Sequence, residues 1–116
     1  MTLEAFYNEI GSDYKTVLAR MGNSEKMLEK FVRKFSNDKT FGELLTSFES
    51  GDYTVAFRMA HTLKGLCANL GLDKLHDSAA ELTESLRNGV SPNSAELLER
   101  VKADHNMIVN ALAQLD

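Results

Sequence analysis

Cysteine, proline, glycine and long apolar runs are scarce in this 116-residue chain, and each shortage excludes a class of protein. The single cysteine, Cys67, leaves no disulfide framework and no multi-cysteine zinc site. One proline and seven glycines are too few for the turns of a sheet protein of this size. The apolar runs fall far short of the roughly 20 residues that a membrane span needs. The acidic, amphipathic N-terminus does not have the character of a signal peptide.

Positive charge is also in short supply. The chain has 13 Lys and Arg against 17 Asp and Glu, a formal net charge of −4. A nucleic-acid-binding domain is usually basic, so this balance argues against a nucleic-acid partner. The length suits one domain with an ordinary buried core. We therefore expect a single helical domain over residues 1–116, reduced and cytoplasmic, with neither a membrane nor a nucleic acid among its partners.

Apolar residues recur at helical spacing nearly throughout the chain. This periodicity predicts helices over residues 3–10, 12–21, 24–35, 40–50, 53–70, 72–88 and 92–115. The local signals for their starts include Ser12 as a cap, Thr40 with Glu43 at capping-box spacing, and Pro92 at the head of the last helix. Amphipathic helices joined by tight turns predict an all-α fold, an antiparallel four-helix bundle with additional short N-terminal helices. The third helix is expected to turn four residues inward: Met27, Leu28, Phe31 and Phe35.

The helix over residues 53–70 has a histidine opposite its apolar stripe. At about 100° per residue, the stripe lies roughly 120° to 200° from His61 on the helical wheel. His61 is therefore expected to point into solvent. Six residues lie within about 60° of it: Thr54, Phe57, Arg58, Lys64, Gly65 and Ala68.

This outer face is unusual for a solvated surface. Gly65 lies in mid-helix, where it costs roughly 1 kcal/mol relative to alanine, and such a glycine usually has a packing or functional reason. Ala68 is also small, so the imidazole has room around it. Lys64 and Arg58 bring positive charge to an acidic protein. A lone exposed histidine is most often an ordinary surface residue, but the combination indicates a group that receives a large anion such as a phosphoryl group.

The remaining candidate residues favour structural roles. His105 shares the stripe of its helix and is expected to be packed or partly buried, while His76 is expected at a boundary. Asp73 and His76 are spaced like two metal ligands, but the further ligands of a metal bundle are missing, so no metal site is expected. Cys67 falls on the core side. No Gly-rich phosphate loop occurs, so the sequence shows no ATP site.

The run from His61 to Gly71, HTLKGLCANLG, closely resembles the signature of histidine-containing phosphotransfer (HPt) domains. The segments AFRMA (56–60) and LTESL (82–86) are also similar to that family. The resemblance extends from about Tyr14 to the C-terminus. His61 matches the phospho-accepting position, Lys64 the adjacent basic position, Gly65 the small position beside it, and Gly71 the turn glycine.

The resemblance implies a helical bundle whose histidine accepts a phosphoryl group from a receiver-domain aspartate and passes it to another in a multistep His-Asp phosphorelay. It implies that response-regulator receiver domains are the partners, with a hybrid sensor histidine kinase as a further candidate. The chain would be a covalent carrier rather than an enzyme and would bind no cofactor, since the divalent ion would belong to the receiver. Lys64 and Arg58 would screen the phosphate, while Gly65, Ala68, Phe57 and Thr54 would form the access and docking surface.

Two departures from the family pattern bear on these expectations. Leu66 stands where small or hydroxylated residues are common, but its place on the wheel faces the core, so we expect little functional effect. Gln114, the only glutamine, is too far along the chain to be assigned as the residue that orients the imidazole. The alternatives are a kinase fragment, a helical adaptor that binds receiver domains without carrying phosphate, and a metal bundle.

Overall fold

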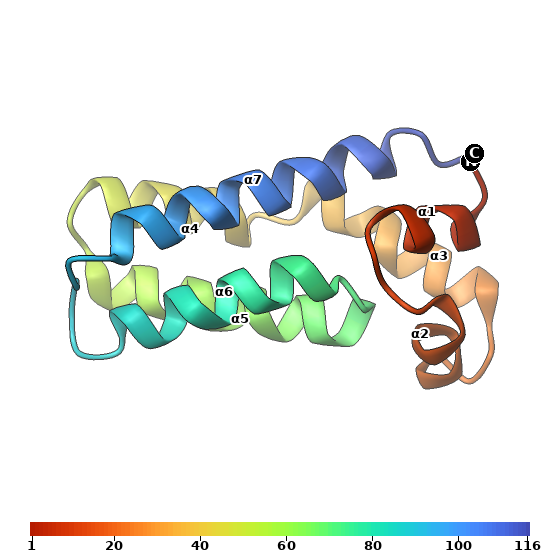
Figure 1. Ribbon diagram of the computed structural model, residues 1–116, viewed down its shortest axis with the longest axis horizontal. Coiled ribbons are helices and arrows are strands. Elements are labelled where there is room, and N and C mark those ends of the chain that lie inside the picture. Colours follow the sequence, from red (N-terminus) through yellow and green to blue (C-terminus); the bar gives the residue numbers. More distant parts are fainter.

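The computed structural model describes residues 1–116 and is helical throughout (Figure 1). A short 3-10 helix, η1 (Phe35–Asn37), joins the third and fourth α-helices. The predicted all-α fold is confirmed. The α-helices are α1 (Leu3–Glu9), α2 (Tyr14–Arg20), α3 (Glu25–Lys34), α4 (Thr40–Glu49), α5 (Tyr53–Leu70), α6 (Asp73–Leu86) and α7 (Ser94–Leu112).

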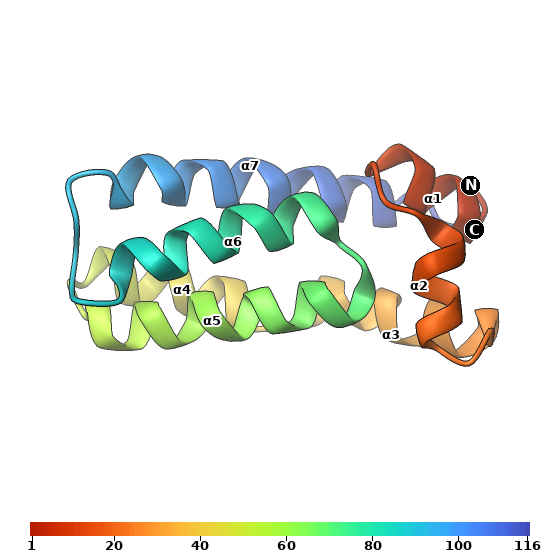
Figure 2. The ribbon, with the colours of Figure 1, turned by 60° about the horizontal axis from the view of Figure 1, so that its bottom comes forward.

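The helices form an elongated antiparallel bundle (Figures 1 and 2). Helices α3 and α4 follow one another along one side of the bundle with η1 between them, and α5, α6 and α7 then alternate in direction. The most extensive packing joins α5 to α6, α4 to α5 and α6 to α7. Short connections force such neighbours to be antiparallel, as the sequence predicted.

One continuous apolar core lies between these helices. From α5 it takes Ala56, Ala60, Leu63, Cys67 and Leu70, which recur every three or four residues and so share one stripe. A fully buried leucine such as Leu63 contributes about 1.5–3 kcal/mol of transfer free energy. Cys67 is fully buried in the core, as predicted, and this burial raises the pKa of its thiol to about 12.

Helices α1 and α2 close one end of the bundle, beside the C-terminus of α5 (Figure 2). The buried Tyr7 hydroxyl donates a hydrogen bond to the Leu70 carbonyl at 2.6 Å. Gly71 ends α5 in a left-handed conformation with φ +70°. A Cβ there would lie 2.1 Å from Cγ2 of Val17, so both the backbone and the α2 contact require glycine. These contacts fix α1 and α2 against the end of α5.

Helix α3 departs from the sequence expectation in the face that it buries. Leu28, Val32 and Phe35 are buried, whereas Met27 is 49% exposed and Phe31 is 38% exposed. The expectation that Met27 and Phe31 point inward is wrong. The buried residues are spaced four and three apart and form a narrow stripe, which leaves the other apolar side chains of α3 on its flanks.

Three predicted helix starts are also corrected. Asp13, not Ser12, caps α2, and the buried Ser12 instead accepts a hydrogen bond from the Asp73 backbone N–H. Thr40 is the first residue of α4, and its N–H is held by the Asp38 carboxylate rather than by a capping box. Pro92 lies in the turn before α7, which begins two residues later. At the starts of α2 and α4, the side chain of an aspartate accepts the backbone N–H that the pattern had assigned elsewhere, whereas α7 begins without a side-chain cap.

His105 is half-buried between two aromatic rings, which confirms its predicted packing role. Its imidazole stacks on Phe41 with the ring centroids 3.7 Å apart and lies 5.7 Å from Phe35. The ring is taken out of water with no carboxylate to compensate a positive charge. Desolvation therefore lowers the pKa of His105 below its ordinary value.

The half-buried imidazole of His105 makes the stability of the fold sensitive to mild acid. Because its pKa is lower in the folded state, the unfolded chain binds more protons once the pH falls below about 6.5. The stability that the neutral ring contributes is therefore complete above that value and is lost as the pH falls through the folded-state pKa. We expect the melting temperature to drop between pH 7 and pH 5, and the drop to be smaller in His105→Phe. Equal drops in both proteins would contradict this origin.

Candidate functional site

The candidate site lies on α5, the helix at the centre of the bundle's packing. Asp52 caps its N-terminus by accepting a hydrogen bond from the Val55 backbone N–H at 3.2 Å, and Gly71 ends it. Helices α4 and α6 cover its apolar stripe from two sides. The opposite face is left to solvent along the middle of the helix. Residues spaced three and four apart on that face form a row.

His61 occupies the middle of this row and is exposed, as predicted. Its imidazole takes part in no hydrogen bond or ion pair within the protein. By contrast, His76 has its Nδ1 3.0 Å from the Asp77 carboxylate and lies partly exposed at the edge of α6. His61 therefore presents free ring nitrogens to solvent. Of the three histidines, it is the one available for chemistry with an incoming group.

The space around His61 is open. Thr54, Gly65 and Ala68 are exposed on the same row. A Cβ placed on Gly65 would meet no atom within 4 Å beyond its own helix backbone. No other helix packs against this position, so the glycine is not there for helix packing. The open face that the wheel predicted is confirmed.

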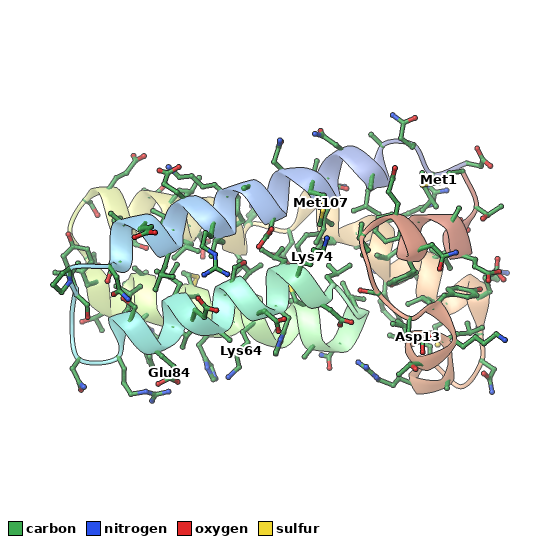
Figure 3. The ribbon with its side chains drawn as sticks, in the orientation of Figure 1. Met1, Asp13, Lys64, Lys74, Glu84 and Met107 are labelled. Atoms are coloured by element: carbon green, nitrogen blue, oxygen red, sulfur yellow. The ribbon has the colours of Figure 1, made fainter.

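The cations of this face are arranged unevenly. Arg58 is exposed and Lys64 is half-buried, each one turn from His61. Lys64 and Glu84 of α6 point outward from the same side of the α5–α6 pair (Figure 3). Hydrogen bonds and charge from Arg87 lower the pKa of Glu84, and Lys64 adds a smaller effect. Glu84 therefore offsets part of the positive charge beside His61, a contribution that the sequence could not reveal.

Phe57, a neighbour of His61 on the outer face of α5, is packed against other residues. Its ring is half-buried, packs against the core and lies over the His61 imidazole, with centroids 6.4 Å apart and planes at 16°. The Arg87 guanidinium lies 5.4 Å from the Phe57 ring centroid and is itself paired with Glu84 at 2.7 Å. Phe57 is therefore not a free aromatic on the outer face, because Arg87, which follows the last residue of α6, covers one side of its ring. The side chain that borders the His61 ring is Phe57. The sequence had offered no residue to orient this ring, because Gln114, the only glutamine, lies far along the chain.

Replacing Phe57 with alanine should lower the free energy of unfolding by about 1.5–2.5 kcal/mol, half the usual cost for a fully buried phenylalanine. It should also shift the NMR resonances of the His61 ring, because the neighbouring aromatic ring is removed. Phe48→Ala is the matched control, since Phe48 is half-buried elsewhere, against Tyr53. Phe48→Ala should lower stability without moving the His61 resonances. Unchanged His61 resonances in Phe57→Ala would contradict the contact.

Leu66 is the second correction on α5. The wheel placed it in the core, but it is only half-buried and lines an open cavity of about 430 Å³. Helices α2 and α3 form the other walls of this cavity. The periodicity of one helix gives the direction of a side chain but does not show whether a neighbouring helix covers it. We call the cavity the α2–α3–α5 groove and define it by Arg20, Met21, Phe31, Lys34, Leu66 and Asn69.

Residues 26–115 match the Hpt domain family. This region includes His61, Lys64, Gly65 and Gly71, and it begins just after the start of α3. The bundle and its exposed histidine agree with that match, and the chain belongs to the Hpt domain family. The family works by phosphotransfer in His-Asp phosphorelays, in which its members carry phosphoryl groups rather than use ATP.

No curated protein and no solved structure matches the chain. None of its helices is both long enough and apolar enough to cross a membrane. The fold brings together no group of three or more His, Cys, Asp or Glu side chains that could hold a metal ion.

Proposed function

We propose that this protein is a phosphorelay intermediate that accepts a phosphoryl group on His61 from a receiver-domain aspartate and passes it to the aspartate of another receiver domain. The observation that carries the proposal is the exposed, unpaired imidazole of His61 beside the empty space at Gly65, within the region that matches the Hpt family. A histidine on this open face does not have the role of a buried structural residue. Receiver domains, including the receiver of a hybrid sensor histidine kinase, are the proposed partners.

The transfer is a nucleophilic substitution at phosphorus. The lone pair of the neutral imidazole nitrogen remote from the backbone attacks in line with the bond to the aspartate oxygen. The N–P bond forms as the P–O bond breaks, and the aspartate carboxylate leaves with the electron pair. The proton on the other ring nitrogen can pass to water. The reverse sequence delivers the group to the next aspartate, so the carrier returns unchanged.

Most of the transition-state stabilisation in this scheme comes from the partner. The receiver domain would supply a divalent ion, which would stabilise the negative charge of the phosphoryl group. This chain supplies access, the nucleophile, and the positive charges of Lys64 and Arg58, which screen the phosphoryl charge. His61 needs space more than it needs local catalytic groups, because the receiver must bring its own site within bonding distance. The open row on α5 meets that requirement.

The direct test is to incubate the protein with a receiver domain that holds a radioactive phosphoryl group. The proposed function predicts a label on this protein that is stable in base and labile in acid, as a phosphoramidate is, together with loss of label from the receiver. A helical adaptor without phosphotransfer would bind the receiver and remain unlabelled. That result would contradict the proposal.

Lys64 should assist transfer modestly through its charge. Its ammonium is partly solvated and Glu84 lies nearby, so we expect Lys64→Ala to slow transfer only about threefold at low ionic strength. The defect should shrink at high salt, where an exposed charge is screened. Lys64→Arg is the matched control and should transfer at nearly the wild-type rate. Stopped-flow or quenched transfer at two salt concentrations measures both variants, and an equal defect at both would point to steric positioning instead.

A further inference from the structure

The turn that follows α6 contains the only Asn-Gly pair of the chain. Asn88 and Gly89 lie between Leu86, the last residue of α6, and Ser94, the first residue of α7. Both residues of the pair are exposed. Asparagine is among the thermolabile residues of proteins, because its side-chain amide can react with the backbone that follows it. The pair therefore has a chemistry of its own, separate from that of His61.

The side chain of Asn88 is free to move. Its exposed amide takes part in no hydrogen bond or ion pair within the protein. By contrast, the side-chain oxygen of Asn93, in the same connection, accepts a hydrogen bond from the Ser85 hydroxyl at 3.0 Å. Nothing therefore prevents the amide carbon of Asn88 from turning towards the backbone nitrogen of Gly89, which follows it along the main chain.

The backbone at Gly89 permits this approach. Gly89 has φ +101°, a conformation that residues with a Cβ rarely adopt, and it carries no side chain to shield its nitrogen. One backbone hydrogen bond, from the Gly89 N–H to the Leu86 carbonyl at 3.1 Å, holds this nitrogen. Helix ends fray, so a bond just beyond the end of α6 opens far more often than a bond in the middle of the helix.

The other asparagines are placed less favourably for this reaction. Each is followed by a residue whose side chain crowds the backbone nitrogen. Asn23 and Asn93 precede serines that are themselves held: the Ser24 hydroxyl caps α3, and the Ser94 hydroxyl accepts the Ser91 N–H. The rest lie within helices, where a hydrogen-bonded backbone resists the change of dihedral angles that ring closure needs: Asn8, Asn37, Asn69, Asn106 and Asn110.

We propose that Asn88 is a site of spontaneous deamidation in the folded protein, through a succinimide formed with Gly89. The Gly89 backbone nitrogen attacks the side-chain carbonyl carbon of Asn88, and the new N–C bond closes the succinimide ring. The bond to the side-chain nitrogen breaks, and that nitrogen leaves as ammonia with the proton of the Gly89 N–H. Water then opens the ring at either carbonyl carbon, which gives aspartate or isoaspartate. Water is the only co-reactant.

The modification changes the charge next to the Arg87–Glu84 pair. Either product replaces a neutral amide with a carboxylate, which adds one negative charge to a chain of net charge −4. The new carboxylate follows Arg87, whose guanidinium pairs with Glu84 at 2.7 Å and covers the Phe57 ring. Isoaspartate also lengthens the main chain of this turn by a methylene group. The inference goes beyond the proposed function, because it needs neither a receiver domain nor a phosphoryl group.

The test is to incubate the whole chain at pH 7 and at pH 9 and to digest samples over time for peptide mass spectrometry. Replacement of –NH2 by –OH is resolved at individual asparagines, and a methyltransferase specific for isoaspartate detects the second product. Asn88→Asp provides the charge standard for isoelectric focusing. Asn88→Gln is the matched control, because the longer side chain closes its ring much more slowly. A parallel incubation in denaturant gives the rate for the unfolded chain.

We expect Asn88 to be the first asparagine lost, with a species of one additional negative charge that Asn88→Gln does not form. The loss should be faster at pH 9, because removal of the Gly89 N–H proton makes the nitrogen nucleophilic. Folded and denatured chains should lose Asn88 at rates that differ by less than about tenfold, since the turn opens locally.

Two outcomes would overturn the inference. One is the loss of another asparagine before Asn88 in the folded protein. The other is a loss of Asn88 that is slower by about tenfold or more in the folded than in the denatured chain, which would show that the hydrogen bond to Leu86 keeps the turn closed. Neither outcome bears on the proposed function, because labelling of His61 by a receiver domain is measured separately on fresh protein.

Discussion

Replacing His61 with glutamine will abolish labelling by a phosphorylated receiver domain while leaving the helical content unchanged. Glutamine keeps a polar, flexible side chain at an exposed helical position, so the fold loses no packing. It removes the only ring nitrogens on the open face of α5, and an amide nitrogen is not a nucleophile at phosphorus under these conditions. The expected effect is a complete loss of transfer, measured by retention of radioactive phosphate on the purified protein and by circular dichroism.

The other two histidines provide the controls. His76→Gln should be labelled like the wild type, because His76 lies at the edge of α6 beside Asp77. His105→Phe should also be labelled, since an aromatic ring of similar shape can stack on Phe41. Residual label on the His61 variant would show that another residue accepts the phosphoryl group, and would contradict the assignment of His61 as the phospho-acceptor.

Substitutions at Gly65 should affect stability and phosphoryl transfer in opposite directions, and the loss of transfer is expected to be second only to that of the His61 variant. Gly65→Ala should raise the free energy of unfolding by up to about 1 kcal/mol, because alanine loses less backbone freedom and its Cβ meets nothing within 4 Å. Gly65→Leu and Gly65→Glu should also fold, but they put a bulky group one turn from the imidazole. Transfer should fall mildly for alanine and severely for leucine and glutamate. The glutamate variant adds charge repulsion against the phosphoryl group.

Gly42 offers a matched control for this series. It is also an exposed helical glycine whose Cβ would meet nothing within 4 Å, but it lies on α4. Gly42→Ala and Gly42→Glu should therefore change stability as the Gly65 variants do and leave transfer unaffected. Melting temperature and transfer rate are measured on the same preparations. A Gly65→Ala protein that melts well below wild type would contradict the open face, because it would mean that another element packs there.

The sequence was sufficient to predict those parts of the site that one helix determines by itself. The spacing of apolar residues on α5 placed His61 in solvent, Cys67 in the core and Gly65 on an open face, because these positions follow from 3.6 residues per turn. It was also sufficient for the number and approximate bounds of the helices, since glycines mark most of their C-terminal ends.

The features that depend on neighbouring helices could not be predicted in this way. Whether Leu66 and Phe31 are covered depends on where α2 and α3 meet α5, and both residues line the groove instead of the core. The covering of Phe57 could not be predicted either, because nothing in its own helix shows that Arg87 lies against it. The same limit applies to Glu84, whose charge reaches Lys64 only because α6 runs beside α5.

The absence of any hydrogen bond or ion pair to the His61 ring has a consequence for the direction of phosphate flow. A protein that bound the phosphorylated imidazole through many hydrogen bonds would stabilise the loaded state, and release of the phosphoryl group would then be unfavourable. This surface offers a few screening charges and no enclosing donors, so it stabilises the loaded carrier only weakly relative to the empty one. Under the proposed function, the equilibrium with each partner then depends chiefly on the stability of that partner's aspartyl phosphate. Net flux through the carrier would follow the relative amounts of loaded donor and empty acceptor, and would reverse when their ratio reverses.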